Sequence, residues 1–559
     1  MAVASLSINE FFGIQQHKDG ALLPVGSARD CRNVTTVDGN LSVAKGYAKY
    51  IEDIVPGSDR ILKLIKMRGD TPKDYVVTAN KIYSHDGDKW NTLYTFSTAL
   101  TTKQIDYVQT LVGPDDCLII ATGQTQMLKV KLSDDTVVLF GTGEYSFQGT
   151  VLSYNAGTKV VTLSASLSAE ALRHAPLDGI TIDGTWLAVT TATGATVTLT
   201  EAPAVAPVSP NAATIRGGGS TAQCNFVETY FGRLLACGDP SNPSRLYWSA
   251  VSGDGRTIED WLSVEGSADA SGGYAEVGES SGDGLRGFKT LATEMFLLKR
   301  HTVFRLFGDT PSTFNFQQVE TFSELSSNAS IVVKYNAPYF LTGTGIKYYD
   351  GTGVLSLNGG IRFINTFIQT ISSVEESKGV HADNMLYFSC KVDPDSVYDD
   401  TLIVYDISRT FSESSYGSYT IRDGFQIADM VSYDGSIYLI NDKRYVYLFN
   451  DGESYDGAVI DAYWSTQFTD MGNKLKQYQV THVVFRGGEG KMSITIDYDQ
   501  AHKSKSVEVF DEKAPAKSVR IDTDNASAFG LTVRNQYGSA FSINGGIQIV
   551  FRDELVNVI

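Results

Sequence analysis

The chain has 559 residues, of which 42% are hydrophobic and 20% charged, and its formal net charge is −18. A surface this acidic repels phosphate backbones, which disfavours sequence-specific recognition of DNA or RNA. At roughly 150 residues per domain the length predicts about three or four domains, and no apolar run approaches the ~20 residues that cross a bilayer.

Residues 1–55 are predicted to be an extended N-terminal arm that forms part of a platform domain. The first residues, MAVASLSINEFF, lack the basic region and the continuous apolar region of a secretion signal. Between Gly20 and Tyr50 the apolar residues come in pairs and singles broken by Gly, Asp and Asn, so we expect mostly irregular, extended chain. The arm ends in a basic and aromatic cluster, Lys45–Tyr50 (KGYAKY).

One pattern recurs through residues 56–141 and 209–455. It consists of an apolar strand, a polar turn, a second strand rich in Ile, Val and aromatic residues, and usually an Asp-Gly or similar turn. The copies are Tyr75–Gly87, Cys117–Asp135, Arg233–Gly255, Met295–Thr310, Pro338–Gly351, Met385–Ser408 and Ser436–Gly452. Their spacing is typical of propeller blades, in which each pair would form the inner part of a four-stranded sheet. We therefore predict an all-β chain built on a β-propeller of about six to eight blades.

An insertion, residues 142–208, interrupts this repeat. Alternating Thr and Val and the turns within Gly149–Pro203 predict a small β-barrel of two hairpins, followed by a Pro-rich and Gly-rich linker, Ala202–Ser220. Helical patterns are short, and the best are Ser168–His174 and Asn365–Glu376.

Residues 456–559 are predicted to form a C-terminal β-sandwich or platform domain. In Lys491–Asp499 a strict period of two places Met492, Ile494, Ile496 and Tyr498 on one face. Ala528–Val533 and Ile547–Phe551 alternate in the same way.

Residues suited to catalysis or metal binding are scattered. The seven histidines have no metal-ligand spacing, and Arg216–Ser220 (RGGGS) lacks the Lys-Ser/Thr of a phosphate loop. Ser84–Trp90 only faintly resembles the Asp-box turn of sialidase-type propellers. Asp393–Asp400 (DPDSVYDD) has oxygen atoms enough for calcium, but an acidic, solvated hairpin loop is the favoured interpretation. We expect no catalytic, cofactor-binding or metal site and no enzymatic activity.

The cysteines show no CxxC spacing and are odd in number. We expect reduced and mostly buried thiols, as in a protein assembled in cytoplasm. They are Cys31, Cys117, Cys224, Cys237 and Cys390.

Two stretches carry a resemblance to a known family. The first is LPVGSARDCRNVTTVDGNLSVAKGY, which ends at Tyr47, and the second is Ala462–Asp499, with a Trp strand, an Asp-x-Gly turn and a paired strand. Together they resemble the tail hub or nozzle proteins of short-tailed bacteriophages, also described as tail tubular protein B or tail stabilisation proteins. The inserted barrel is not covered by the resemblance.

The resemblance implies a structural virion protein, assembled in the host cytoplasm. It implies a homohexameric ring that closes the channel of the portal and tail adaptor, conducts genomic DNA without reading its sequence, and docks tail fibres or tailspikes. An acidic lumen would let DNA slide without sticking. The arm would then thread over a neighbouring subunit. The alternative interpretation is that the arm supplies a strand that closes the propeller of its own chain.

Two other functions remain alternatives. One is a glycan-binding or polysaccharide-degrading propeller of the virion, and the other is a cytoplasmic interaction scaffold without any particle association. Release of saccharide from capsular or lipopolysaccharide substrates would distinguish the first from the structural role.

Overall fold

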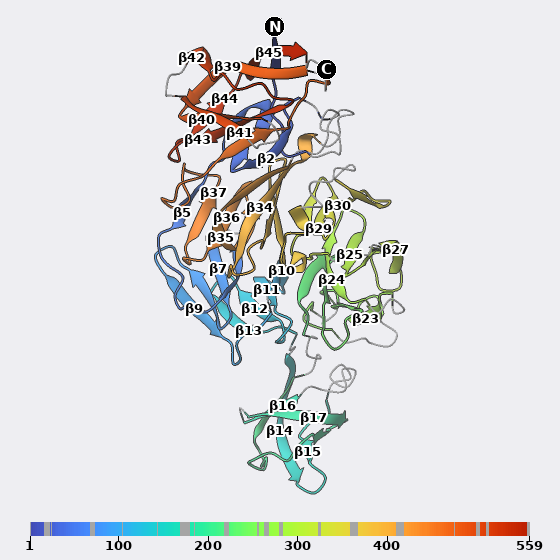
Figure 1. Cartoon of the computed structure of the whole chain (residues 1–559). Helices are drawn as coiled ribbons and strands as arrows, with labels where there is room; N and C mark the ends of the chain where they lie inside the picture. The colour runs from blue at the N-terminus through green and yellow to red at the C-terminus, as the bar shows by residue number, and fades with distance from the viewer. Residues whose placement is uncertain are drawn as a thin grey trace. The chain divides into compact units, whose positions relative to one another are not determined.

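The computed structural model of the chain is almost entirely β-structure (Figure 1). It describes residues 2–15, 23, 25–67, 73–102, 104–141, 144–167, 179–183, 185–216, 223–253, 257–261, 268–278, 283–321, 326–357, 367–409, 419–473, 476–498, 503–509 and 514–555. Across these ranges no helix is long and apolar enough to span a bilayer. The chain forms two compact units, one of Met1–Lys66, Gly87–Trp90 and Glu324–Ile559, the other of Met67–Asp86 and Asn91–Ser323.

Five four-stranded sheets follow one another as up-and-down meanders. Their middle strands are apolar over whole runs, as in β25, where all five residues are buried because both faces are covered. The strands of the first two sheets are β6 (Ile61–Met67), β7 (Lys73–Thr78), β8 (Lys81–His85), β9 (Trp90–Thr95), β10 (Asp106–Val112), β11 (Asp115–Ala121), β12 (Leu128–Lys131) and β13 (Thr136–Leu139). Those of the next three are β20 (Phe226–Tyr230), β21 (Arg233–Cys237), β22 (Arg245–Trp248), β23 (Gly273–Glu276), β24 (Leu285–Thr290), β25 (Met295–Lys299), β26 (Thr302–Phe307), β27 (Asn315–Thr321), β28 (Val332–Lys334), β29 (Ala337–Thr342), β30 (Gly345–Tyr349) and β31 (Val354–Ser356).

The sixth and seventh sheets share one long strand. The first half of β35 (Tyr419–Tyr433) pairs with β34, and after a register shift its second half pairs with β36. The sixth sheet is β32 (Lys378–Ala382), β33 (Met385–Cys390), β34 (Asp399–Asp406) and β35; the seventh is β35, β36 (Ser436–Asn441), β37 (Val446–Phe449) and β5 (Tyr47–Ile51). Each of the seven predicted repeats supplies the two middle strands of a sheet, which confirms the propeller class.

The cluster Lys45–Tyr50 supplies the last strand of the seventh sheet. β5 pairs antiparallel with β37, so Tyr47 lies opposite Phe449 although about four hundred residues separate them. Tyr47 faces inward, 4.6 Å from the Tyr447 ring centroid. A strand of the arm therefore completes a propeller sheet of its own chain, which was the alternative prediction for the arm.

The rest of the arm pairs with the C-terminal segment of the same chain. One sheet contains β1 (Ala2–Ile8), β45 (Ile547–Leu555), β39 (Lys476–Gly490), β44 (Phe541–Ile543), β4 (Leu41–Val43), β3 (Val34–Thr35) and β42 (Ala514–Arg520). The facing strands are β2 (Ala28–Arg32), β38 (Tyr463–Thr466), β43 (Phe529–Asn535), β40 (Met492–Tyr498) and β41 (Lys503–Val509), continuous with β35. For strands β1 to β5, threading over a neighbouring subunit was therefore the wrong expectation.

Aromatic residues join the two C-terminal sheets. Tyr478 of β39 and Phe551 of β45 have ring centroids 5.5 Å apart, and Phe551 lies 5.5 Å from Phe529 of β43. In β40 the predicted residues Met492, Ile494, Ile496 and Tyr498 are the buried ones.

The insertion closes into a barrel with its own apolar core. Its strands are β14 (Glu144–Asn155), β15 (Val160–Leu163), β18 (Thr196–Leu199), β17 (Thr185–Thr193), β16 (Gly179–Ile182) and β19 (Ala212–Arg216), in the order of pairing. The last strand, β19, lies beyond the predicted boundary at residue 208 and within the predicted linker, because its pairing with β14 and β16 was not visible in the local pattern.

Helix is scarce. In the described part of the predicted helix Asn365–Glu376, Phe367 and Ile368 are helical, a turn follows, and the 3-10 helix Val374–Glu376 forms after a break, so a helix continuous to Glu376 was wrong. Among the described residues, Val37–Gly39 and Ile407–Arg409 also form 3-10 segments. The predicted helical turn Ser168–His174 lies outside the described residues.

Candidate functional site

An open pocket of about 580 Å³ lies at one end of the sixth and seventh sheets. Three connections form it: the loop between β33 and β34, the irregular middle of β35, and the turn between β36 and β37. Tyr47 and the segment around Tyr455 complete the wall. The lining residues are Tyr47, Val392, Asp393, Ser396, Asp400, Thr401, Asp423, Gly424, Phe425, Gln426, Asp442, Lys443, Tyr455 and Ala458.

The loop of the pocket is the acidic stretch Asp393–Asp400. The Asp400 carboxylate accepts hydrogen bonds from the backbone N–H groups of Val392 at 2.9 Å and Asp393 at 2.7 Å, which closes the loop at its base. Asp393 in turn accepts from the N–H of Asp395 at 2.9 Å. These carboxylates thus order their own loop, and within the described ranges no group of three or more His, Cys, Asp or Glu residues could hold a metal ion.

The middle of β35 contributes Asp423 through a fixed network. The Asn33 side chain donates to the Asp423 carboxylate at 3.0 Å, and Arg32 Nε lies 3.8 Å from it. Burial raises the pKa of Asp423 above its ordinary value, although Arg32 and Asn33 oppose the shift. Gly424 follows with a φ of 90°, a left-handed conformation that glycine adopts without strain.

Two tyrosines, Tyr47 and Tyr455, form the aromatic wall of the pocket. Tyr455 is 2% exposed and its hydroxyl donates to Asn33 Oδ1 at 3.0 Å. Its ring stacks on Tyr47 with centroids 5.3 Å apart, and burial raises the pKa of Tyr47 to about 12. Neither phenol is ionised near neutral pH, so the wall supplies shape and not acid–base chemistry.

The pocket carries excess negative charge. Asp393, Asp400 and Asp442 have no cationic group within 4.0 Å in the part of the chain that the structure describes. The only lysine of the lining, Lys443, is engaged by Asp456 at 3.6 Å. The electrostatics of the pocket therefore favour a positively charged ligand over a carboxylate or a phosphate.

The cysteines are buried and unpaired, as predicted. Burial raises the pKa values of Cys31, Cys117, Cys224, Cys237 and Cys390 above the ordinary thiol value, which keeps these thiols protonated. The Ser84–Trp90 stretch contains the end of β8, the hairpin turn and the first residue of β9, and Asn91 donates to Asp86 at 2.7 Å across this turn.

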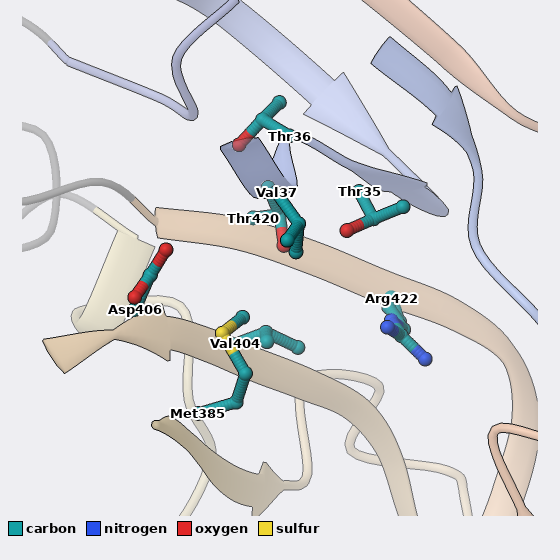
Figure 2. A pocket seen from close by; sticks show the side chains of 8 residues that line it. All are labelled: Thr35, Thr36, Val37, Met385, Val404, Asp406, Thr420 and Arg422. Atoms are coloured by element: carbon teal, nitrogen blue, oxygen red, sulfur yellow. The ribbon is translucent and has the colours of Figure 1, made fainter. Parts of the chain in front are cut away.

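A second, much smaller cavity lies under the arm (Figure 2). Its volume is about 10 Å³, room for one water molecule. Thr35, Thr36 and Val37 come from the arm, and Met385, Val404, Asp406, Thr420 and Arg422 come from β33, β34 and β35. The buried Nε of Arg422 has no hydrogen-bond partner among described residues, which a single water would satisfy.

The arrangement of the four-stranded sheets defines a β-propeller protein. No protein-family model matches the chain, and no curated protein matches its sequence. Three solved structures show a likeness of fold. BamB from Moraxella catarrhalis is 9% identical, with 73% of this chain and 97% of that chain covered and a TM-score of 0.33. The Neurospora crassa Pan2 WD40 domain is 8% identical, with 73% of this chain and 94% of that chain covered and a TM-score of 0.31. The computationally designed Ika8 protein is 11% identical, with 72% of this chain and 99% of that chain covered and a TM-score of 0.34.

Sequence reasoning found one side of the pocket and missed the others. The loop Asp393–Asp400 stood out because acidic residues cluster locally. Asp423 and Asp442 carry no local signal, since they sit in ordinary strand and turn sequence and reach the pocket only through the pairing of β34, β35 and β36.

Proposed function

We propose that this chain is a structural protein of the tail of a short-tailed bacteriophage, a hub or nozzle subunit. Copies of it would form a homohexameric ring at the portal and tail adaptor, through which genomic DNA leaves the capsid and on which fibres or tailspikes dock. The protein would be assembled in the host cytoplasm and function in the virion.

One observation carries the proposal: the two stretches that resemble the family form a single structural element. β2 of the first stretch pairs antiparallel with β38 of the second, with Cys31 opposite Trp464 and Arg32 opposite Tyr463. Trp464 is fully buried, packs edge-on against Phe11 at 5.0 Å, and donates its Nε1–H to the carbonyl of Phe12 at 2.9 Å. A resemblance at two distant stretches that fold together supports a shared architecture better than either stretch alone.

Charge and chemistry are consistent with this role. A net charge of −18 suits a protein past which DNA slides, because an acidic surface does not bind the DNA phosphates tightly. The cis pairing of β1 to β5 leaves ring formation to other surfaces of the folded subunit.

The decisive experiment mixes the purified full chain with the portal and tail-adaptor proteins of the same phage. Mass photometry is expected to show a hexamer on the adaptor, and cryo-EM a ring around a channel. A chain that stays monomeric and has no affinity for the adaptor would overturn the proposal. Assays of saccharide release from capsular and lipopolysaccharide substrates test the glycan-acting alternative in parallel.

A further inference from the structure

We propose that β1 (Ala2–Ile8) is a docking edge for a second copy of this chain, whose own β1 pairs antiparallel with the first across a two-fold axis at Ser5. The inference rests on the edge of the sheet and does not depend on the tail assignment. A two-fold contact joins two copies and then closes, so it is distinct from any contact that runs around a ring.

One side of β1 is open. The strand pairs with β45 in an unbroken antiparallel register, from Ala2 opposite Asp553 to Ile8 opposite Ile547. On its other side β1 meets no strand in the described part of the chain, and it is the last strand of its sheet. Alternate N–H and C=O groups of β1 therefore point out of the sheet, where another extended chain can hydrogen-bond to them.

The sequence of β1, AVASLSI, lacks the features that usually keep an edge strand from pairing. It contains no charged residue, proline or glycine. The other edges of the two C-terminal sheets are protected: β41 carries Lys503, Lys505 and Glu508, β42 carries Pro515 and Lys517, and β3 has only two residues. Charges, proline and short length all hinder edge-to-edge pairing. Among the described edges of these sheets, β1 is thus the one that is both long and unprotected.

The core-facing side of β1 fits that of a second β1. Ile8 is 1% exposed on this side, and Leu6 is partly buried against the same core. Ala4 shares the side by the strand period of two and is exposed. Antiparallel pairing about Ser5 sets Leu6 of each copy opposite Ala4 of the other, a large side chain beside a small one, and allows the whole strand to pair. The contact would extend the apolar core from one copy to the next and remove Leu6 from water.

The outer side of the contact has no like charges opposite each other. Val3, Ser5 and Ser7 are exposed on this side, and Val3 is 70% exposed. In the same register Val3 lies opposite Ser7 of the second copy, and Ser5 lies opposite Ser5. Copies of a chain with a net charge of −18 repel each other, so they approach most easily through an uncharged edge. The open edge defines an extended strand as the partner, and the match of β1 with itself selects a second copy.

The test measures dimerisation of the full chain by sedimentation velocity. One strand from each copy makes a small contact, so we expect a weak dimer with a Kd of about 1–100 µM. Ser5→Lys sets two lysines directly opposite each other at the axis, where like charges destabilise a strand pair. The matched control, Ser7→Lys, adds the same charge to the same side of the same strand but lies opposite Val3 of the second copy. Both positions are exposed on an edge strand, where lysine is well tolerated.

A third variant, Ser5→Glu, separates charge from folding. Ser5→Lys and Ser5→Glu both give up the hydrogen bond that Gln548 donates to the Ser5 hydroxyl at 2.8 Å, so a mixture of the two isolates the effect of charge. Each variant alone should raise the Kd about fivefold, and Ser7→Lys should change it less than about twofold. An equal mixture of Ser5→Lys and Ser5→Glu should dimerise at least as well as the original chain, a recovery that no folding defect produces.

Three results would overturn the proposal. The original chain could remain monomeric up to about 100 µM, which is weaker than even a small strand contact allows. Ser5→Lys and Ser7→Lys could weaken the dimer equally, or leave it equally intact, which would place the contact on another surface. The mixture of Ser5→Lys and Ser5→Glu could fail to recover the dimer. Ring formation on the adaptor is measured separately, so failure here leaves the proposed function standing.

Discussion

The Tyr455 hydroxyl donates a hydrogen bond to the side-chain oxygen of Asn33 at 3.0 Å, across 422 positions of sequence. The same oxygen accepts from the Asp423 backbone N–H at 3.0 Å, while Asn33 Nδ2 donates to the Asp423 carboxylate at 3.0 Å and the Asp461 carbonyl at 2.8 Å. Asn33 is 1% exposed and has a φ of 52°. One carboxamide thus fastens the arm to β35 and to the segment before β38.

Asn33→Ala is expected to lower the free energy of unfolding by about 2–4 kcal/mol, because it leaves buried donors and acceptors of three segments unpaired and places alanine at a left-handed φ of 52°. Chemical denaturation followed by tryptophan fluorescence measures the loss. Asn40→Ala is the matched control, since the Asn40 side chain makes no hydrogen bond to described residues. A loss below about 1 kcal/mol would contradict the role given to the carboxamide.

Asn33→Asp is expected to cost more at pH 7 than at pH 5. The new carboxylate would face Asp423 and lose both N–H donors, and protonation of either acid relieves the repulsion. Melting temperatures of Asn33→Asp and Asn33→Ala at the two pH values make the comparison. A difference between the variants that does not shrink at the lower pH would contradict the contact.

Lys66 joins the first sheet to the seventh through three tyrosine rings. Its Nζ lies 4.2 Å from the Tyr50 centroid, 4.1 Å from Tyr438 and 5.5 Å from Tyr433, and Lys66 is only 7% exposed. Lys66→Met keeps the stem and removes the cation, so we expect a loss of about 1–2 kcal/mol. Lys334→Met is the control, because its partner Tyr335 is 69% exposed and the exposed pair contributes less. Equal losses in the two variants would contradict the account.

The barrel is expected to be separable from the sheets around it. Its first and last strands pair, with Glu144 opposite Arg216, so the chain enters and leaves at one place. Replacing residues 142–222 by a short Gly/Ser linker should leave a soluble protein whose melting temperature is nearly unchanged, since loop closure costs only about 0.6 kcal/mol per doubling of length. The excised barrel should fold alone, as a dispersed NMR spectrum would show. An insoluble deletion variant would mean that the barrel supports the neighbouring sheets.

Stability should fall as the solution is acidified through the ordinary histidine range. Burial lowers the pKa of His381 below 6.5, and Lys334 lowers it further. Below about pH 6.5 the unfolded chain therefore binds a proton at His381 that the folded chain does not bind. The folded state loses stability as the pH falls through this range. His381→Gln should flatten the change in melting temperature between pH 7.5 and 5.5. Identical slopes in the two proteins would assign the pH dependence to other groups.

Local patterns were sufficient for much of the fold. The seven repeats, the period of two in β40 and the turn-rich insertion are properties of neighbouring residues, and they predicted the propeller class and the buried face of β40. The helix predicted over Asn365–Glu376 failed, because a short apolar period carries little weight against the packing of the sheets beside it.

Side-chain period and turn chemistry act over a few residues, so the strands and their turns could be predicted from local sequence. Which strands pair became visible in the folded chain alone: β5 pairs with β37, β2 with β38, and β19 with β14. Backbone hydrogen bonds are alike for every strand, so partners hundreds of residues apart are selected by burial and by buried contacts such as those of Asn33 and Trp464. The acidic pocket is decided in the same way, because Asp393, Asp423 and Asp442 come together only when β34, β35 and β36 pair.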